Sequence, residues 1–208
     1  MKSQCVVFGA GGHSRSVIFA LRRAGINPLW AIDTVSKKED EHILGVPVKV
    51  DSDLIRLLKS MDVSTVYLAI GDNSLRQKYF EELRLEKYLL PNFQAISAIV
   101  SEDIQWGEGN IVLEKAYIGP ESHLGDNNII NTGAIIEHQC KIGSHNHLAP
   151  GALLAGSVII GDGNFLGLGS GVIPQIKIGA QVTLGAMGLL RSHTPENGTY
   201  VGVPARKK

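Results

Sequence analysis

Apolar residues recur at every sixth position through the second half of the chain. From residue 100 to residue 184 all fifteen positions of this register are apolar. They are Val100, Trp106, Val112, Ile118, Leu124, Ile130, Ile136, Ile142, Leu148, Leu154, Ile160, Leu166, Val172, Ile178 and Leu184. A period of six fits neither the 3.6-residue turn of an α-helix nor the alternation of a hairpin strand. It predicts a parallel β-helix, in which short flat sides stack and glycines ease the corners.

Residues 1–95 follow a different pattern, in which short apolar runs alternate with amphipathic segments. The predicted strands span residues 5–8, 29–32 and 63–70, and the predicted helices span residues 14–24, 53–59 and 74–88. Ser14 is a suitable N-cap for the first helix, and the polar run 36–41 is expected to be a loop. Alternation of this kind is typical of a parallel sheet with right-handed crossovers.

These two patterns predict two domains. Residues 1–95 are expected to form a Rossmann-like α/β domain, and residues 96–208 a parallel β-helix with a closing segment at its end. The bulk composition excludes two classes of partner. Lys+Arg and Asp+Glu are equal at 20 each, so no global field attracts nucleic acid or an anionic membrane surface.

The cellular compartment can be predicted from what the sequence lacks. It has two cysteines, no apolar run long enough to span a membrane and no recognisable signal peptide. We therefore expect a cytoplasmic protein that does not enter the membrane.

A glycine-rich turn lies between the first predicted strand and the first predicted helix. The turn reads Gly9-Ala10-Gly11-Gly12-His13, and Asp33 ends the second predicted strand. Backbone N–H groups at a helix N-terminus can bind a phosphate, and an acid in the place of Asp33 can bind a ribose. The sequence thus favours a half-sized nucleotide site, with a purely structural turn as the alternative.

Three motifs together resemble one family. They are the Gly-x-Gly-Gly-His turn, the stretch Ile70-Gly71-Asp72-Asn73-x-x-Arg76, and the hexads, which end in Val201-Gly202-Val203-Pro204-Ala205-Arg206. In this combination the chain resembles the sialic acid O-acetyltransferase-like sugar acyltransferases, which include bacterial N-acetyltransferases of nucleotide-linked 4-amino-sugars. The resemblance implies a left-handed parallel β-helix with three hexads per coil that forms a homotrimer. It also implies a nucleotide-sugar site whose residues are Gly11, Gly12, His13, Asp33 and Gly71.

The resemblance implies a catalytic histidine as well. Glu137-His138 matches the Glu-His motif that carries the general base of the family, and a neutral imidazole suits that role. Many relatives follow this histidine with an acid, but here the position is Gln139, so Glu137 is the nearest candidate to orient the ring. Gly156 follows His138 by three hexads, one coil further on, where its N–H could bind the oxyanion of a tetrahedral intermediate.

Acetyl-CoA is the expected co-substrate, and the resemblance assigns three residues to it, His147, Leu168 and Ala186. His147 follows His138 by only half a coil. The two side chains are therefore expected to point out of opposite parts of one prism. They can then share a site only between neighbouring subunits.

The alternatives are limited. Cys140 is a conceivable nucleophile, but its place in the hexad favours the core. A zinc site of His138, His145 and His147 is conceivable between subunits, but we expect no metal because that type of protein lacks the first domain. One departure from the family is Ala95, where relatives usually carry a histidine.

The expected reaction is acetyl transfer from acetyl-CoA to the amino group of a nucleotide-linked deoxy-amino-sugar, in the synthesis of a surface polysaccharide such as the O-antigen of lipopolysaccharide. O-acetylation of a sialic acid-type sugar and a non-catalytic nucleotide-sugar scaffold are the alternatives. The sequence leaves open the nucleotide (UDP, dTDP, GDP or CMP), the sugar and the acetylated position.

Overall fold

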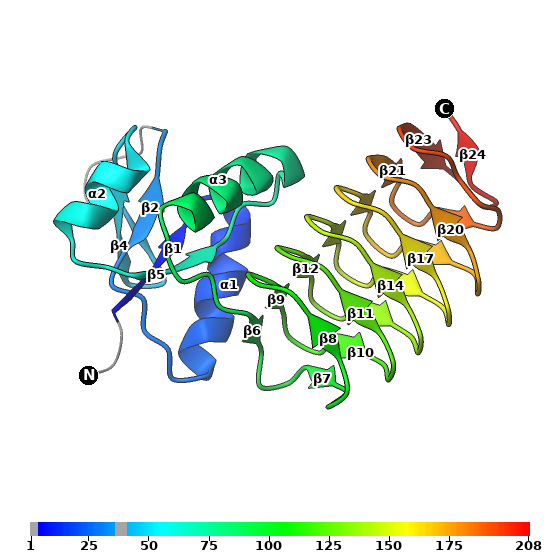
Figure 1. The fold of residues 1–208 in the computed structure, drawn as a ribbon, viewed down its shortest axis with the longest axis horizontal. Helices are drawn as coiled ribbons and strands as arrows, with labels where there is room; N and C mark the ends of the chain where they lie inside the picture. Colours follow the sequence, from blue (N-terminus) through cyan, green and yellow to red (C-terminus); the bar gives the residue numbers. More distant parts are fainter. Residues whose placement is uncertain (1–3, 36–40) are drawn as a thin grey trace. The chain divides into compact units, whose positions relative to one another are not determined.

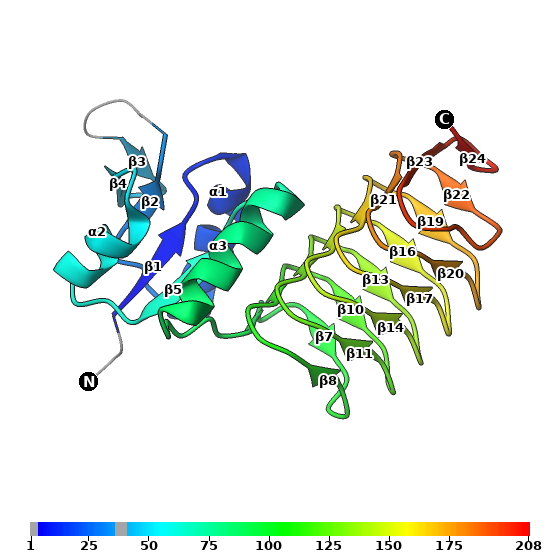
Figure 2. The same cartoon turned by 45° about the horizontal axis from the view of Figure 1, so that its top comes forward.

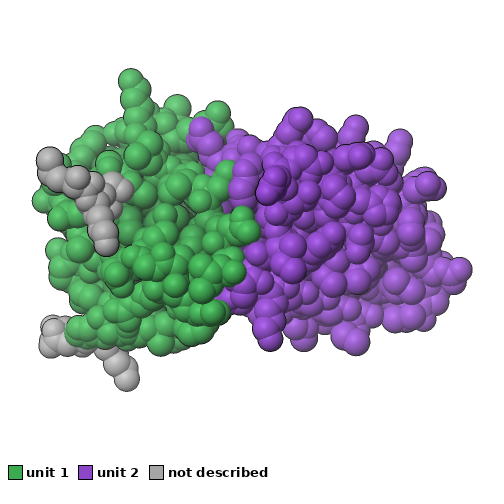
Figure 3. Space-filling model, turned by 90° about the horizontal axis from the view of Figure 1, so that it is seen from below, with its two compact units in different colours: residues 1–96 green, residues 97–208 purple. Residues whose placement is uncertain are grey.

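The structure is a computed structural model that describes residues 4–35 and 41–208. The predicted loop over residues 36–41 therefore lies almost entirely outside the described residues. Two compact units make up the chain, Met1–Ile96 and Ser97–Lys208, which are coloured separately in Figure 3.

The first unit is an α/β unit whose described residues form three helices. In chain order its elements are β1 (Cys5–Phe8), α1 (Gly12–Arg23), β2 (Ala31–Asp33), β3 (His42–Ile43), β4 (Val46–Val50), α2 (Leu54–Ser60), β5 (Thr65–Leu68), α3 (Asn73–Leu85) and β6 (Phe93–Gln94). Five strands form one sheet in the order β3-β4-β2-β1-β5 (Figures 1 and 2). All its pairs are parallel except β3 with β4. This confirms the predicted α/β class, although the sequence patterns did not predict β3 or β4.

The core of this unit lies between the sheet and its helices. Val6 and Phe8 of β1 are buried together with Ile32 of β2, Leu58 of α2 and Phe80 of α3.

Among the described helices, none combines the length and the apolar character that a membrane crossing requires.

The start of α1 differs from the prediction. The helix begins at Gly12, with Gly11 as its N-cap, and no side chain caps it. Ser14 lies inside the first turn, where its hydroxyl donates to the carbonyl oxygen of Gly11 at 2.7 Å. The prediction of Ser14 as N-cap is therefore wrong. Glycine has no side chain that could accept a hydrogen bond at the N-cap. The first N–H groups of this helix therefore face the turn uncapped by a side chain.

The second unit is a parallel β-helix. Its strands are β7 (Ile99–Val100), β8 (Gln105–Trp106), β9 (Ile111–Val112), β10 (Tyr117–Ile118), β11 (His123–Leu124), β12 (Ile129–Ile130), β13 (Ile135–Ile136), β14 (Lys141–Ile142), β15 (His147–Leu148), β16 (Leu153–Leu154), β17 (Ile159–Ile160), β18 (Phe165–Leu166), β19 (Gly171–Val172), β20 (Lys177–Ile178), β21 (Val182–Leu184), β22 (Leu189–Leu190), β23 (Gly198–Val201) and β24 (Arg206–Lys207).

Every third strand stacks on the same side of this prism. One side runs β7-β10-β13-β16-β19-β22 and the next runs β8-β11-β14-β17-β20, as Figures 1 and 2 show. The third side carries β9, β12, β15, β18 and β21, followed by β23 and β24. Tyr117 pairs with Ile135, three hexads later, so each coil takes three hexads as predicted.

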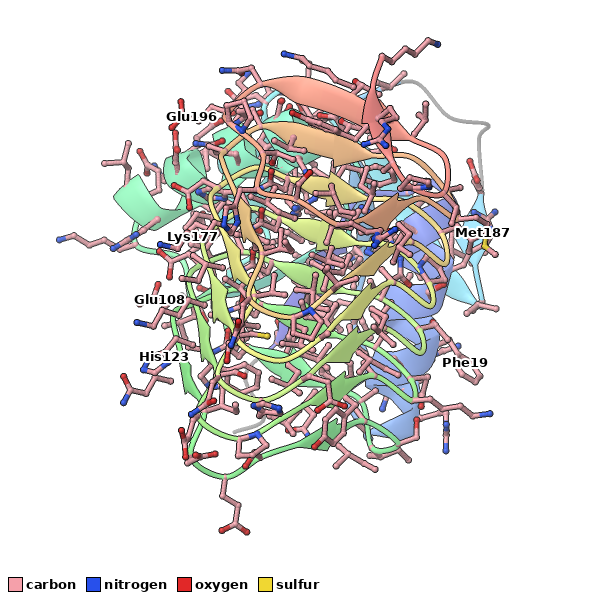
Figure 4. The ribbon with its side chains drawn as sticks, turned by 90° about the vertical axis from the view of Figure 1, so that its right-hand side faces the viewer. Phe19, Glu108, His123, Lys177, Met187 and Glu196 are labelled. Atoms are coloured by element: carbon pink, nitrogen blue, oxygen red, sulfur yellow. The ribbon has the colours of Figure 1, made fainter. Side chains whose placement is uncertain are left out.

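The hexad register explains how the prism is filled. Thirteen of the fifteen predicted positions, from Val112 to Leu184, are buried. The two exceptions, Val100 and Trp106, lie in the first coil and are half-buried. His123 of β11 and Lys177 of β20, which hold the preceding position, are exposed and point outward in Figure 4. The six-residue period therefore reports one large apolar residue per side, and the position two residues before it is buried as well, from Asn110 to Val182.

A ladder of asparagines also lies inside the prism. Asn110, Asn128, Asn146 and Asn164 are buried and follow one another at intervals of one coil. The side-chain oxygens of Asn110, Asn128 and Asn146 each accept from the amide of the next asparagine, at 2.9, 3.1 and 3.0 Å. The same oxygens accept the backbone N–H of that next residue. The ladder therefore satisfies its buried polar groups and links successive coils.

Candidate active site

The predicted catalytic residues occupy one corner of the prism, between β13 and β14. Gln139 takes the left-handed conformation there, with φ of 59°. Glu121 and Ser157, one coil before and one coil after, take it too, with φ of 58° and 60°. The corner therefore repeats from coil to coil, and His138 stands exposed on it.

The ring of His138 lies against Gly156 in the next coil. A Cβ atom added at Gly156 would lie 2.5 Å from Cε1 and 2.6 Å from Nε2 of His138. Any side chain at position 156 would therefore displace the imidazole. The structure thus brings together the two residues that the sequence analysis paired by repeat arithmetic.

The backbone N–H of Gly156 is not part of the coil-to-coil ladder. The same corner position holds Pro120 one repeat before His138 and Pro174 one repeat after Gly156, and proline has no N–H to donate. No described residue accepts a hydrogen bond from the Gly156 N–H. A backbone donor thus stands next to the imidazole ring.

The hydrogen-bond partner of His138 is Gln139. Nδ1 of His138 lies 3.4 Å from Oε1 of Gln139. Nε2 of Gln139 in turn donates to Oε2 of Glu121 at 2.8 Å. Among the described residues no hydrogen bond joins Glu137 to His138, and the Glu137 side chain is half-buried. The acid that the corner connects to His138 is therefore Glu121. Sequence reasoning missed it, although Glu121 stands one full coil before Gln139.

The residues assigned to acetyl-CoA lie along a different side of the prism. His147 is on β15, where its Nε2 lies 3.1 Å from Nδ2 of Asn131 and its ring packs edge-on against Phe165 at 5.2 Å between centroids. Leu168 and Ala186 are exposed on the corners that follow β18 and β21, one coil apart. Met187, beside Ala186, projects from the same corner (Figure 4). The three assigned residues thus share one side and its corner, which His138 does not.

The alternatives of a metal and of a nucleophilic cysteine can be examined in the same unit. Among the described residues no group of three or more His, Cys, Asp or Glu side chains gathers as a metal site. His145 is buried with its Nδ1 2.9 Å from Nδ2 of Asn127, on a corner apart from His138. Cys140 is fully buried, and burial raises the pKa of its thiol. A buried, protonated thiol is a poor nucleophile.

The predicted nucleotide-sugar residues line one cavity in the first unit. Its volume is about 350 Å³, within the usual range for small-molecule sites. The lining residues are Phe8, Gly9, Ala10, Gly11, Gly12, His13, Asp33, Thr34, Ala69, Ile70, Gly71, Leu75 and Tyr79. All five predicted residues are among them. Thr34, Leu75 and Tyr79 also line the cavity and were missed, because no motif of the sequence pointed to them.

The glycines of the turn differ in what they allow. Gly9 has φ of 120°, and a Cβ there would lie 2.6 Å from the carbonyl oxygen of Ala69. Gly9 is therefore required by the fold itself. A Cβ at Gly11 or Gly12 would meet no atom within 4 Å, so these two glycines leave open space. The absence of side chains at Gly11 and Gly12 serves access to the backbone.

Asp33 also has a structural contact. Its Oδ2 accepts from the backbone N–H of Ala10 at 3.2 Å, and its Oδ1 accepts from that of Val35 at 3.0 Å. The carboxylate thus ties the turn to the end of β2. Because each carboxylate oxygen can accept more than one hydrogen bond, Asp33 can still contact a ligand in the cavity.

The stretch from Ile70 to Arg76 contributes Ile70, Gly71 and Leu75 to the lining of the cavity. Asp72 caps α3 by accepting from the N–H of Leu75 at 2.7 Å. The guanidinium of Arg76 donates to the carbonyl oxygen of Ile70 at 3.1 Å and to Oδ1 of Asn73 at 2.9 Å. Burial lowers the pKa of Arg76 to about 9, partly offset by the nearby charge of Asp72. The motif is therefore a buried clamp that holds the loop bearing Gly71.

Family models match both units. The PglD N-terminal domain matches residues 4–83, and the bacterial transferase hexapeptide repeat (six repeats) matches residues 121–156. No curated protein matches the chain at a significant level.

Several solved structures match along the whole chain. A perosamine N-acetyltransferase variant from Caulobacter crescentus, in complex with CoA and GDP-perosamine, superposes with a TM-score of 0.93 and 37% identity, covering 100% of this chain and 98% of that one. The acetyltransferase domain of PglB from Neisseria gonorrhoeae FA1090 gives 0.90 and 28%, covering 100% of both chains. WeeI from Acinetobacter baumannii AYE, at 0.86 and 23% with 100% of both chains covered, shares the fold.

The motifs, the two units and these matches agree on one assignment. An identity of 37% that covers 98% of the perosamine N-acetyltransferase is enough to show the family. The chain belongs to the hexapeptide-repeat sugar acyltransferases with a PglD-type N-terminal domain.

Proposed function

We propose that this protein transfers the acetyl group of acetyl-CoA to the amino group of a nucleotide-linked deoxy-amino-sugar, with His138 as the general base. The observation that carries the proposal is the contact between the exposed imidazole of His138 and Gly156. It joins a base and a backbone donor on one corner, in a family whose solved members include one bound to CoA and GDP-perosamine.

The chemistry follows from these two groups. The sugar amine attacks the carbonyl carbon of the thioester, so that a C–N bond forms and the carbonyl electrons move onto oxygen. Nε2 of His138 accepts the proton that the nitrogen loses. The N–H of Gly156 donates to the oxyanion. Collapse of the intermediate breaks the C–S bond, and the imidazolium returns the proton to the departing sulfur of CoA. No covalent enzyme intermediate is needed.

The donor is assigned to the side of the prism that carries His147. The apolar, exposed side chains of Leu168 and Ala186 support this assignment, because the pantetheine arm of acetyl-CoA needs apolar contacts and backbone partners along an extended path. PglB has been solved with acetyl coenzyme A on the same fold.

The acceptor nucleotide is assigned to the cavity of the first unit. The N-terminus of α1, with the open Gly11 and Gly12, suits a diphosphate, and His13, Asp33 and Gly71 complete the lining. The carboxylate of Asp33 suits a ribose hydroxyl or a protonated sugar amine.

The proposal includes a homotrimer. The side β7-β10-β13-β16-β19-β22 carries apolar outward residues on five of its six strands, namely Ile99, Tyr117, Ile135, Leu153 and Leu189, and Gly171 on β19. The corner of His138 borders this side on one edge, and the corner of Leu168 and Ala186 borders it on the other. Association through this side is expected to bring His138 of one copy to the acetyl-CoA residues of a neighbour. A cytoplasmic location is also part of the proposal, and the free thiols of Cys5 and Cys140 fit a reducing compartment.

The test is thiol release from acetyl-CoA with matched acceptors. GDP-, UDP-, dTDP- and CMP-linked 4-amino-sugars are compared with the same free amino sugars and with free sialic acid. A nucleotide-linked amine should be preferred by about two orders of magnitude in kcat/KM, about 3 kcal/mol of transition-state binding. Equal or faster acetylation of a free hydroxyl sugar would overturn the amino-sugar assignment.

A further inference from the structure

Three side chains form a column along the corner that carries His138. Glu121, Gln139 and Ser157 are spaced by one coil, and all three have positive φ. Their side chains therefore leave the backbone in the same direction. Nε2 of Gln139 donates to Glu121 at 2.8 Å, and the Ser157 hydroxyl donates to Oε1 of Gln139 at 3.4 Å. Gln139 is thus held from both sides.

The carboxylate fixes which end of the Gln139 amide faces His138. An ionised carboxylate only accepts hydrogen bonds, so the NH₂ group of Gln139 must face Glu121. Oε1 then faces Nδ1 of His138, 3.4 Å away. An amide oxygen only accepts, so Nδ1 of His138 must carry the proton. In the neutral ring this leaves the lone pair on Nε2.

We propose that Glu121 is a positioning residue that sets the tautomer of His138 through Gln139. The inference rests on the proposed function in one respect, that Nε2 is the basic atom of the reaction. The relay replaces the direct acid-to-histidine contact that an acid at position 139 would make. It delivers a fixed Nδ1–H tautomer without placing a carboxylate against the imidazole.

The first experiment reads the tautomer itself. Two-bond ¹H–¹⁵N spectra of the seven histidine rings are recorded, and the signals of His138 are assigned by their loss in His138→Ala. In the wild type the neutral ring should carry its proton on Nδ1. In Glu121→Ala the Gln139 amide is free to turn, so a mixture of both tautomers is expected. Glu108→Ala, which removes an exposed glutamate from another corner (Figure 4), should leave the His138 signals unchanged.

The second experiment uses kinetics. Glu121→Ala should lower kcat about tenfold and leave KM for acetyl-CoA within about twofold, because Glu121 is linked to His138 through Gln139 and lies apart from the side assigned to acetyl-CoA. Glu121→Gln should lose part of kcat, because two facing amides can pair in either orientation. Adding Gln139→Glu to Glu121→Gln should recover kcat to within about threefold of wild type. In that exchange the new carboxylate at position 139 accepts directly from Nδ1–H, while the new amide at position 121 donates to the carboxylate. Rescue by this exchange would not follow from a merely structural role.

The outcomes separate the inference from the proposed function. An unchanged His138 tautomer in Glu121→Ala overturns the relay. The relay is also overturned if the kcat losses of Glu121→Gln and Gln139→Glu simply add in the double variant. A tautomer that shifts as expected, in a protein that transfers acetyl to no amino sugar, supports the relay and refutes the reaction. If Glu121→Ala fails to fold, the spectra of the Glu121→Gln single variant and the Glu121→Gln/Gln139→Glu exchange still decide the tautomer.

Discussion

The imidazole of His138 occupies the space that a side chain at Gly156 would fill. A Cβ atom at position 156 would lie 2.5 Å from Cε1 of the ring, closer than any real contact of this kind. A glycine at position 156 is therefore needed for the position of the His138 ring, which is the proposed base.

The first prediction concerns this contact. In Gly156→Ala the exposed ring of His138 can turn away from the new methyl group, so the fold should persist with a small change in Tm. We expect kcat to fall about 10²-fold, because the ring leaves its position beside the oxyanion donor. Steady-state kinetics with acetyl-CoA and a nucleotide-linked amino sugar measure the effect.

A double variant is the control. His138→Ala/Gly156→Ala should be no slower than His138→Ala alone, because the methyl group then has no ring to displace. If the fold-losses in kcat of the two single variants multiply in the double variant, Gly156→Ala does not act by displacing the His138 ring.

The second prediction concerns the cavity of the first unit. Gly11→Val places its side chain in open space, so folding should be retained while the close approach of a phosphate is blocked. The thermal stabilisation by nucleotide sugars should disappear, and that by acetyl-CoA should persist. Gly9→Ala provides the contrast, since its Cβ would collide with the Ala69 carbonyl and should lower Tm even without ligand. Intact nucleotide-sugar binding in Gly11→Val would exclude the turn as the phosphate site.

The third prediction concerns Arg76. Arg76→Lys retains a charge but loses the fork that reaches Ile70 and Asn73, so the free energy of unfolding of the first unit should fall by about 2–4 kcal/mol. The affinity for nucleotide sugars should fall with it, because the loop of Gly71 loses its clamp. Denaturant unfolding checks the first effect, with Lys78→Ala on the exposed face of α3 as the control. Equal stability of Arg76→Lys and Lys78→Ala would show that the clamp carries no energy.

The fourth prediction concerns the assembly. Single His138→Ala and His147→Ala variants should each lose activity, the second through a raised KM for acetyl-CoA. Co-expression of the two variants should restore part of the activity, because mixed trimers contain interfaces in which both histidines are wild type. A fully active monomer in solution would refute the shared site.

The sequence predicted the coil architecture well because one physical constraint dominates it. Each side of the prism buries one large apolar residue at the same place in every hexad, so the register from Val112 to Leu184 could be read directly. The N-terminus of α1 was harder to predict. Ser14 is an ordinary capping residue, but Gly11 ends the turn and the hydroxyl of Ser14 bonds back to it. Local propensity and turn geometry competed, and the turn geometry prevailed.

The candidate site could be predicted only in part, for a related reason. Repeat arithmetic brought Gly156 to His138, because a fixed coil of three hexads converts spacing into contact. The same arithmetic places Glu121 one coil before Gln139. The acid that orients His138 was instead predicted to be Glu137, its neighbour in the sequence. In a β-helix the nearest side chains are one coil away, and adjacent residues point in different directions.

The most direct test of the account is the turnover of His138→Ala with acetyl-CoA and a saturating nucleotide-linked amino sugar. We predict that kcat falls by about 10²–10⁴-fold while Tm and the KM for acetyl-CoA stay near wild type. His123→Ala, which removes an exposed histidine from β11, should keep full activity. Near-wild-type turnover of His138→Ala would contradict the mechanism.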